Sequence, residues 1–180
     1  MVIVDTTVWV DYLREVENPE TKWLDRELTR QRLGLTDMIL NEVLLAIRDE
    51  GEFGRVRDEL LKFAVFAAEG CGMAVAENYR SLRQRGYTVR KMTNCWIATF
   101  CLMHGHRLLH RDRDFYPFEK VLGLQVVKAL EPSGMRLWNP THRKVRDEWG
   151  TRPKWPVREI CLAYPYCVLI HFTDAEELPA

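Results

Sequence analysis

Short apolar runs alternate with longer amphipathic stretches along the first 127 residues of the chain. The apolar runs are nearly continuous and are bounded by polar residues, which is typical of buried strands in a parallel sheet. The sequence therefore predicts strands at residues 2–4, 32–36, 63–67, 107–110 and 123–127.

In the amphipathic stretches, apolar residues recur every three or four positions, as on the buried face of a helix. Within residues 37–49, for example, Ile39 and Val43 are four residues apart. This periodicity predicts helices at residues 6–15, 19–31, 37–49, 55–63, 73–85 and 93–105.

Regular alternation of strands and helices predicts an α/β domain, with a parallel sheet covered by helices on both faces. We assign residues 1–127 to this domain. Residues 128–180 are rich in Trp and Pro and lack a clear period, so we expect an irregular C-terminal extension. It is either a partner-binding tail or a segment read past an altered stop codon.

Composition limits the number of domains in the protein and its cellular location. The chain has 180 residues, of which 47% are hydrophobic, and this is enough for one domain with a real core. No apolar run approaches the roughly 20 residues of a membrane helix, and we expect no signal peptide. The five cysteines are odd in number and show no tight pairing, which indicates reduced thiols and a cytoplasmic location.

The net charge is zero, but the charges are unevenly distributed. Residues 1–70 carry a balance of −6, whereas residues 71–113 carry a balance of +6. A basic segment inside a neutral protein is either a phosphate-binding face or a solvated helix surface.

Acidic residues gather at the predicted strand ends. Asp5 ends the first predicted strand, and Asp112 and Asp114 follow the strand at 107–110. Glu42 lies within an otherwise apolar helical stretch. Two carboxylates about 4 Å apart repel by roughly 4 kcal/mol at an effective dielectric constant near 20, so such a cluster needs a cation. Oxygen ligands suit magnesium or manganese, and the sequence predicts a site for one of them at this edge of the sheet.

Each acid also has a simpler interpretation. Asp5 could be the N-cap of the helix that starts at Thr6, and Glu42 could pair with an arginine. Asp112 or Asp114 could cap the turn that follows them.

Three histidines lie close together in the sequence and offer a general base or a metal site instead. A strand over residues 107–110 would separate them in space, so we interpret them as structural. They are His104, His106 and His110.

The stretches "VIVDTTVWVDYL", "ILNEVLLAI" and "GHRLLHRDRDF" resemble the PIN-domain ribonucleases, specifically the VapC toxins of bacterial type II toxin–antitoxin pairs. The resemblance covers residues 1–127. It implies a three-layer α/β/α fold and a Mg²⁺- or Mn²⁺-dependent endoribonuclease that hydrolyses phosphodiester bonds in tRNA or another structured RNA. It also implies a cognate antitoxin that holds the toxin inactive, and a homodimer.

The resemblance assigns roles position by position. It implies that the catalytic residues are Asp5, Glu42 and Asp112. The metal ligands that it implies are Asp5, Asp112, Asp114 and the residue at position 94. Thr6 or Thr7 falls where the family has a hydroxyl beside the first Asp. With a phosphate substrate, the basic segment becomes an RNA-backbone contact, carried by Arg90, Lys91, Arg111 and Arg113.

One position departs from the family. Where the family usually has Asp at the start of a helix, "TNCWIATFC" has Asn94, which is also a good N-cap residue. An amide oxygen can bind magnesium but brings no charge, so this change predicts weaker metal binding. The alternative function is therefore a weakened or inactive PIN module that still binds antitoxin or RNA. A third reading, an aspartate-nucleophile phosphatase, needs a second Asp at position 7, where Thr7 stands.

Overall fold

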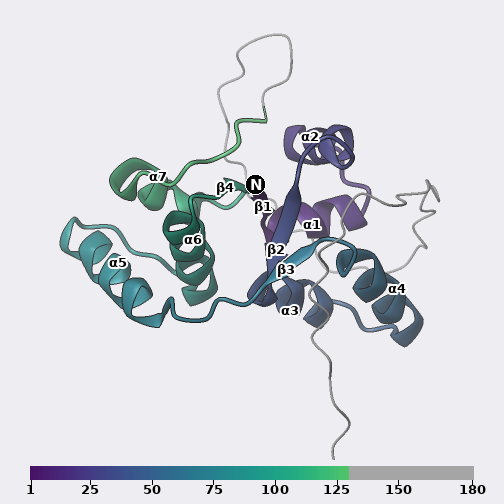
Figure 1. Cartoon of the computed structure of the whole chain (residues 1–180), viewed down its shortest axis with the longest axis horizontal. Coiled ribbons are helices and arrows are strands. Elements are labelled where there is room, and N and C mark those ends of the chain that lie inside the picture. Colours follow the sequence, from purple (N-terminus) through teal and green to yellow (C-terminus); the bar gives the residue numbers. More distant parts are fainter. Residues whose placement is uncertain (130–180) are drawn as a thin grey trace, which may run out of the picture.

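The computed structural model of the chain describes residues 1–129 (Figure 1). In this part, a four-stranded parallel sheet in the order β3-β2-β1-β4 has helices on both faces, which confirms the predicted three-layer α/β/α fold. Apart from residues 128 and 129, the predicted extension lies outside the described residues.

Four strands and seven α-helices make up this part of the chain. The strands are β1 (Val2–Val4), β2 (Leu33–Thr36), β3 (Ala64–Phe66) and β4 (Arg107–Leu109). The helices are α1 (Thr6–Leu13), α2 (Pro19–Glu27), α3 (Asp37–Leu45), α4 (Glu50–Leu60), α5 (Gly72–Gln84), α6 (Met92–His104) and α7 (Tyr116–Leu122), and a short 3₁₀-helix, η1, spans Arg113–Phe115.

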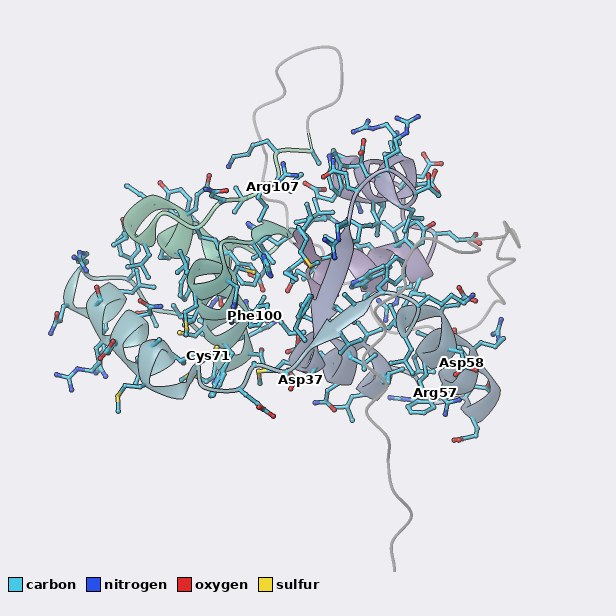
Figure 2. The ribbon with its side chains drawn as sticks, viewed as in Figure 1. Asp37, Arg57, Asp58, Cys71, Phe100 and Arg107 are labelled. Carbon is cyan, nitrogen blue, oxygen red and sulfur yellow. The ribbon has the colours of Figure 1, made fainter. Side chains whose placement is uncertain are left out.

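The helices divide into two layers. Helices α1 to α4 lie on one side of the sheet and α5 to α7 lie on the other (Figure 1). Helix α1 packs on α2 and α3, and α5 packs on α6 and α7. Figure 2 shows Phe100 among the side chains of the α6 layer and Asp58 on α4 in the opposite layer. None of the helices within residues 1–129 combines the length and the apolar character needed to cross a bilayer.

Strand β1 lies at the centre of the sheet and fixes where the chain leaves it. All its residues are fully buried, and Val2 lies opposite Leu33 of β2 and Arg107 of β4. The backbone N–H of Asp5 donates to the carbonyl of Leu109 at 2.9 Å, so the first residue after β1 is still tied to β4. Asp5 is therefore held at the carboxyl edge of the sheet.

Some element boundaries differ from those predicted. Residues 123–127 were expected to form a fifth strand, but the structure has a single bridge there, between Leu108 and Val126. The helix predicted at 55–63 begins earlier, at Glu50, because the Asp49 side chain caps it by accepting from the N–H of Glu52.

Candidate active site

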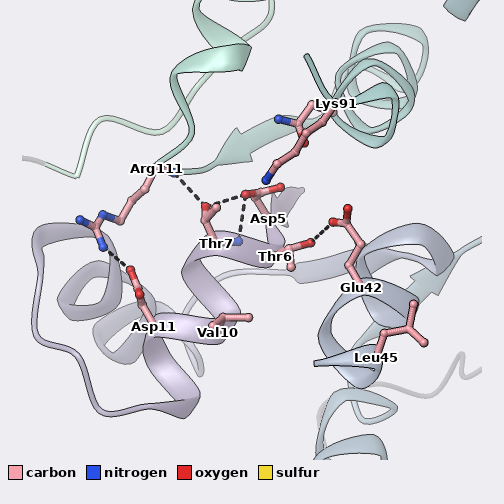
Figure 3. Close-up of a pocket in the computed structure, with 10 residues that line it drawn as sticks. Asp5, Thr6, Thr7, Val10, Asp11, Glu42, Leu45, Lys91 and Arg111 are labelled. Carbon is pink, nitrogen blue, oxygen red and sulfur yellow. Dashed lines mark hydrogen bonds and ion pairs between the residues drawn. The ribbon is translucent and has the colours of Figure 1, made fainter. Parts of the chain in front are cut away.

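A cavity of about 560 Å³ opens at the carboxyl edge of β1 (Figure 3). Its walls come from the first turns of α1, from α3, from the start of α6 and from the loop after β4. The residues that line it are Asp5, Thr6, Thr7, Val10, Asp11, Glu42, Leu45, Lys91, Asn94 and Arg111. The topology thus brings together several of the site residues that were predicted from separate stretches of sequence.

Asp5 is both the N-cap of α1 and a wall of the cavity. Its Oδ2 atom accepts hydrogen bonds from the Thr7 hydroxyl at 2.6 Å and from the Thr7 N–H at 3.0 Å. Burial, with smaller contributions from the negative charges of Glu42 and Asp112, raises the pKa of Asp5 to about 6 against the lowering effect of these hydrogen bonds. The capping interpretation is correct and does not exclude a second role, because a charged carboxylate that faces a cavity still favours a cation.

Glu42 reaches the cavity from α3 and, within residues 1–129, does not pair with an arginine. Its Oε2 atom accepts a 2.6 Å hydrogen bond from the Thr6 hydroxyl. Thr6 and Thr7 are neighbours in the first turn of α1, so one short segment positions two acids from different elements (Figure 3).

Asp112 lies beside the cavity and is held by three donors. It caps η1 by accepting from the Asp114 N–H at 3.0 Å. Its Oδ2 atom accepts from the Asn94 amide at 3.0 Å and lies 3.5 Å from Lys91 Nζ. Burial favours a higher pKa for Asp112, but the Asp114 N–H, the Asn94 amide and Lys91 outweigh it and lower the pKa below its usual range.

Asn94 is not a helix cap. Helix α6 begins at Met92 with Lys91 at the N-cap position, so Asn94 lies inside the first turn and the capping interpretation is wrong. Its buried side chain lines the cavity and donates to Asp112. A carboxylate at position 94 could not make this hydrogen bond and would face the carboxylate of Asp112.

Asp114 does not line the cavity. Its buried carboxylate accepts from the backbone N–H of Arg90 at 3.3 Å and from the Arg90 guanidinium at 3.0 and 3.2 Å. The alternative that Asp114 caps the turn is not observed, because Asp112 has that role. Asp114 is thus placed to anchor the segment before α6, and the metal-ligand role implied for it gains no support from its position.

The four predicted RNA contacts are placed differently from one another. Lys91 and Arg111 line the cavity, whereas Arg90 and Arg113 are exposed and do not line it. The N–H of Arg111 donates to the Thr7 hydroxyl at 3.2 Å, and its guanidinium contacts two acids of α1 and α2, Asp11 and Glu20.

Three lining residues were missed in the sequence, namely Val10, Asp11 and Leu45. A signal for two of them exists, because Val10 and Asp11 stand four residues after Thr6 and Thr7 and so share their helix faces. Leu45 is 75% exposed at the end of α3 and gives the cavity an apolar rim.

The three histidines take no part in the cavity. The expectation that β4 separates all of them is wrong for one pair, because the rings of His104 and His106 stack with centroids 6.0 Å apart. His110 packs separately against Phe115.

The donor atoms at the cavity suit a hard divalent cation. They are carboxylate and amide oxygens, the ligands that magnesium prefers. Within residues 1–129, no three His, Cys, Asp or Glu side chains lie close enough to hold an ion among themselves. Magnesium commonly keeps several waters and uses only one or two protein carboxylates. Asp5 fits such an ion, because its carboxylate is buried, faces the cavity and lies near two further acids.

The sequence of the chain is similar to one protein-family model and to several named proteins. The family model for the PIN domain matches residues 2–121. Ribonuclease VapC11 of Mycobacterium tuberculosis is 31% identical over 130 residues, which are 69% of this chain and 96% of that protein. The VapC ribonuclease Mb1587 of Mycobacterium bovis matches with the same identity and coverage.

Solved structures share the fold. The structure of VapBC2 from Rickettsia felis, bound to a DNA fragment from its promoter, matches with a TM-score of 0.58 at 14% identity. The match covers 71% of this chain and 98% of that chain. VapBC-1 from nontypeable Haemophilus influenzae matches with a TM-score of 0.56 at 16% identity, over 72% and 98% of the two chains. The family model and the 31% identity together show that the chain belongs to the PIN-domain family, in its VapC group.

Proposed function

We propose that the chain is a Mg²⁺- or Mn²⁺-dependent endoribonuclease and the toxin of a toxin–antitoxin pair. Its curated relatives are named ribonucleases, and the solved structures with its fold are VapBC assemblies. The observation that carries the proposal is the cavity at the carboxyl edge of β1. There, the buried Asp5 lies near Glu42 and Asp112, while Lys91 and Arg111 supply positive charge from the same walls.

The chain's own residues bind and orient the substrate in this proposal. Lys91 and Arg111 contact phosphate oxygens of the RNA backbone, which positions the strand without reading its sequence. Thr7 and Thr6 fix the directions of the Asp5 and Glu42 carboxylates. Asp5 and Asp112 would hold the divalent ion, with the amide oxygen of Asn94 as a neutral ligand.

A divalent ion bound there would lower the pKa of a water ligand and neutralise charge on the phosphate. A side-chain nucleophile is then unnecessary, and in this proposal Glu42 would accept a proton from the attacking water. The products of such hydrolysis carry 5′-phosphate and 3′-hydroxyl ends.

The proposed partners follow from the same family. They are a cognate antitoxin, an RNA substrate such as tRNA or another structured RNA, and a second copy of the chain in a homodimer. A cytoplasmic location is part of the proposal. The three cysteines of the described residues, all free and buried, support it.

A second candidate function is a weakened or inactive module that binds RNA or antitoxin. The observation that favours it is Asn94, whose amide donates to Asp112 where the family usually has a carboxylate. In this candidate the cavity still binds phosphate, but metal affinity is too low for turnover.

An RNA cleavage assay tests the first proposal. The purified full-length chain should cleave total RNA or tRNA when Mg²⁺ or Mn²⁺ is present. Cleavage should stop when EDTA is added. Asp5→Asn should lower the rate at least about 100-fold, because it removes the charged group that faces the cavity. The matched control is Asp58→Asn, on an exposed part of α4 and paired with Arg57 (Figure 2), which should cleave like the parent. Equal rates for Asp5→Asn and the parent would show that the nuclease proposal is wrong.

Asn94→Asp separates the two candidates in the same assay. If the site is a nuclease weakened by its missing charge, the variant should cleave faster in Mg²⁺ than the parent. A parent and variant that are both inactive, yet still retard RNA in a gel, would favour the binding module.

A further inference from the structure

One carboxylate oxygen beside the cavity already has a cation next to it. Asp112 Oδ2 lies 3.5 Å from Lys91 Nζ and accepts a 3.0 Å hydrogen bond from Asn94 Nδ2. Both donors belong to one segment, since Lys91 is the N-cap residue of α6 and Asn94 lies in its first turn. Asp112 is thus held by a protein ammonium and a neutral amide.

The charge balance around Asp112 depends on the residue at position 94. With a carboxylate there, Asp112 would lose the amide donor and meet a second negative charge within about 3 Å, which favours binding of a strong cation. With Asn94, the positive charge of Lys91 is enough to balance Asp112. The other oxygen of Asp112 is engaged by the Asp114 N–H, so Oδ2 is the one turned toward the cavity residues.

Lys91 is also able to move away. Its side chain is 59% exposed, whereas that of Asp112 is only 16% exposed, so the lysine rather than the aspartate is the mobile partner. The aliphatic stem of lysine is long and flexible, and an ion pair with one well-exposed partner is held only weakly.

We propose that Lys91 is an internal counter-cation for Asp112, and that a divalent ion must displace its ammonium from Oδ2 in order to use this carboxylate. The proposal rests on the metal site of the proposed function and adds regulation of that site by the protein's own charge. Lys91 is therefore a positioning residue that acts through Asp112. In the absence of the ion it balances the charge of Asp112 and helps to orient its carboxylate, and it lowers the apparent affinity of the site.

Binding of Mn²⁺ alone to the full-length chain, followed by the electron paramagnetic resonance signal of the free ion, measures this competition. Lys91→Met keeps most of the unbranched side chain and removes the charge, so it should tighten Mn²⁺ binding about two- to fivefold. Lys91→Arg keeps the charge and should bind Mn²⁺ like the parent. Lys62→Met, which removes a surface lysine paired with Glu59, is the matched control and should also bind like the parent.

A double-mutant cycle distinguishes competition at Asp112 from a general effect of charge. If Lys91 acts through Asp112, then Lys91→Met should no longer tighten Mn²⁺ binding in a protein that already carries Asp112→Asn. An equal gain in both backgrounds, or no gain in the single variant, would overturn the proposal. Thermal unfolding of each variant, followed by circular dichroism, verifies that the proteins compared are folded.

The result of the Mn²⁺-binding experiment does not depend on whether the chain cleaves RNA. A chain that cleaves RNA but shows no coupling between Lys91 and Asp112 would keep the nuclease function and overturn this inference. A chain that shows the coupling without cleaving RNA would keep this inference and overturn the nuclease function. Failure of every variant to bind Mn²⁺ would overturn the inference, because there would be no ion for Lys91 to oppose.

Discussion

Two neighbouring threonines control the directions of two acids at the cavity. The Thr6 hydroxyl donates to Glu42 and the Thr7 hydroxyl donates to Asp5, each at 2.6 Å. Successive residues of a helix point about 100° apart, so adjacent side chains can reach carboxylates that come from different elements. Both threonines after the first strand are therefore needed, because each one orients a different carboxylate.

The buried Asp5 and the half-buried His110 should affect stability in opposite directions as the pH falls. Burial raises the pKa of Asp5 from 3.8 to about 6, so the native state takes up this proton first, and acidification from pH 6 toward pH 4 stabilises the protein by up to about 3 kcal/mol. Burial lowers the pKa of His110 from 6.5 to about 4, so the unfolded state takes up that proton first. The contribution of the neutral His110 is lost over the same range, again by about 3 kcal/mol.

Urea unfolding at pH 7 and pH 4.5, with EDTA present, separates these two contributions. Asp5→Asn should lose more stability than the parent on acidification, because it no longer gains from protonation. His110→Gln should lose less, because it no longer resists protonation. Parallel pH profiles for the parent and both variants would contradict the assignment of these two pKa shifts.

The sequence reveals charged residues more readily than their partners. Asp5 and Asp112 could be placed at one edge of the sheet because Asp5 directly follows one apolar run and Asp112 comes two residues after another, and parallel strands align their carboxyl ends. The pairing of Asp114 with Arg90 spans 24 residues and depends on how two loops meet, so no local pattern encodes it. Asn94 was placed at the site from the sequence, but its hydrogen bond to Asp112 was not predicted for the same reason, since the two residues are 18 positions apart.

At the level of elements, strand positions were easier to predict than element ends. The apolar run that forms β1 ends abruptly at Asp5, and the observed strand matches the prediction, 2–4. Residues 123–127 have the same apolar character, but a strand also needs a partner over several residues. Here hydrogen bonds to Leu108 form only one bridge.

Strand β2 contains a glycine that packing requires. A Cβ atom at Gly34 would lie 2.9 Å from the backbone oxygen of Ala64 on β3, and a backbone atom in a paired strand cannot easily move aside. Gly34→Ala should therefore lower the free energy of unfolding by about 1–3 kcal/mol. The matched control is Gly54→Ala in α4, where nothing lies within 4 Å of the new methyl group and the helix should gain about 0.5–1 kcal/mol. Urea unfolding measures both, and equal effects of the two substitutions would contradict this interpretation.

At the level of the whole molecule, one hydrophobic core extends from Val2 to Leu124. It joins both helical layers to the sheet, and every lining residue of the cavity lies within the same span. The assignment of residues 1–127 to one domain remains a prediction.

A chain that ends after Ala129 tests this domain boundary. It keeps the whole described core, so it should unfold in a single cooperative transition when heated and followed by circular dichroism. The full-length chain is the reference in the same buffer. A shortened chain with no cooperative transition would show that the boundary is wrong.

The paired cations of the site have a consequence for how it would respond to salt. Arg111 contacts Asp11 and Glu20, and Lys91 contacts Asp112, so each already has a carboxylate of the protein as its counterion. When a polyanion binds there, Lys91 and Arg111 exchange a carboxylate partner for a phosphate. Few sodium or potassium ions are then released into bulk water. Affinity for a nucleic acid should then fall less steeply with ionic strength than the number of basic groups at the cavity implies.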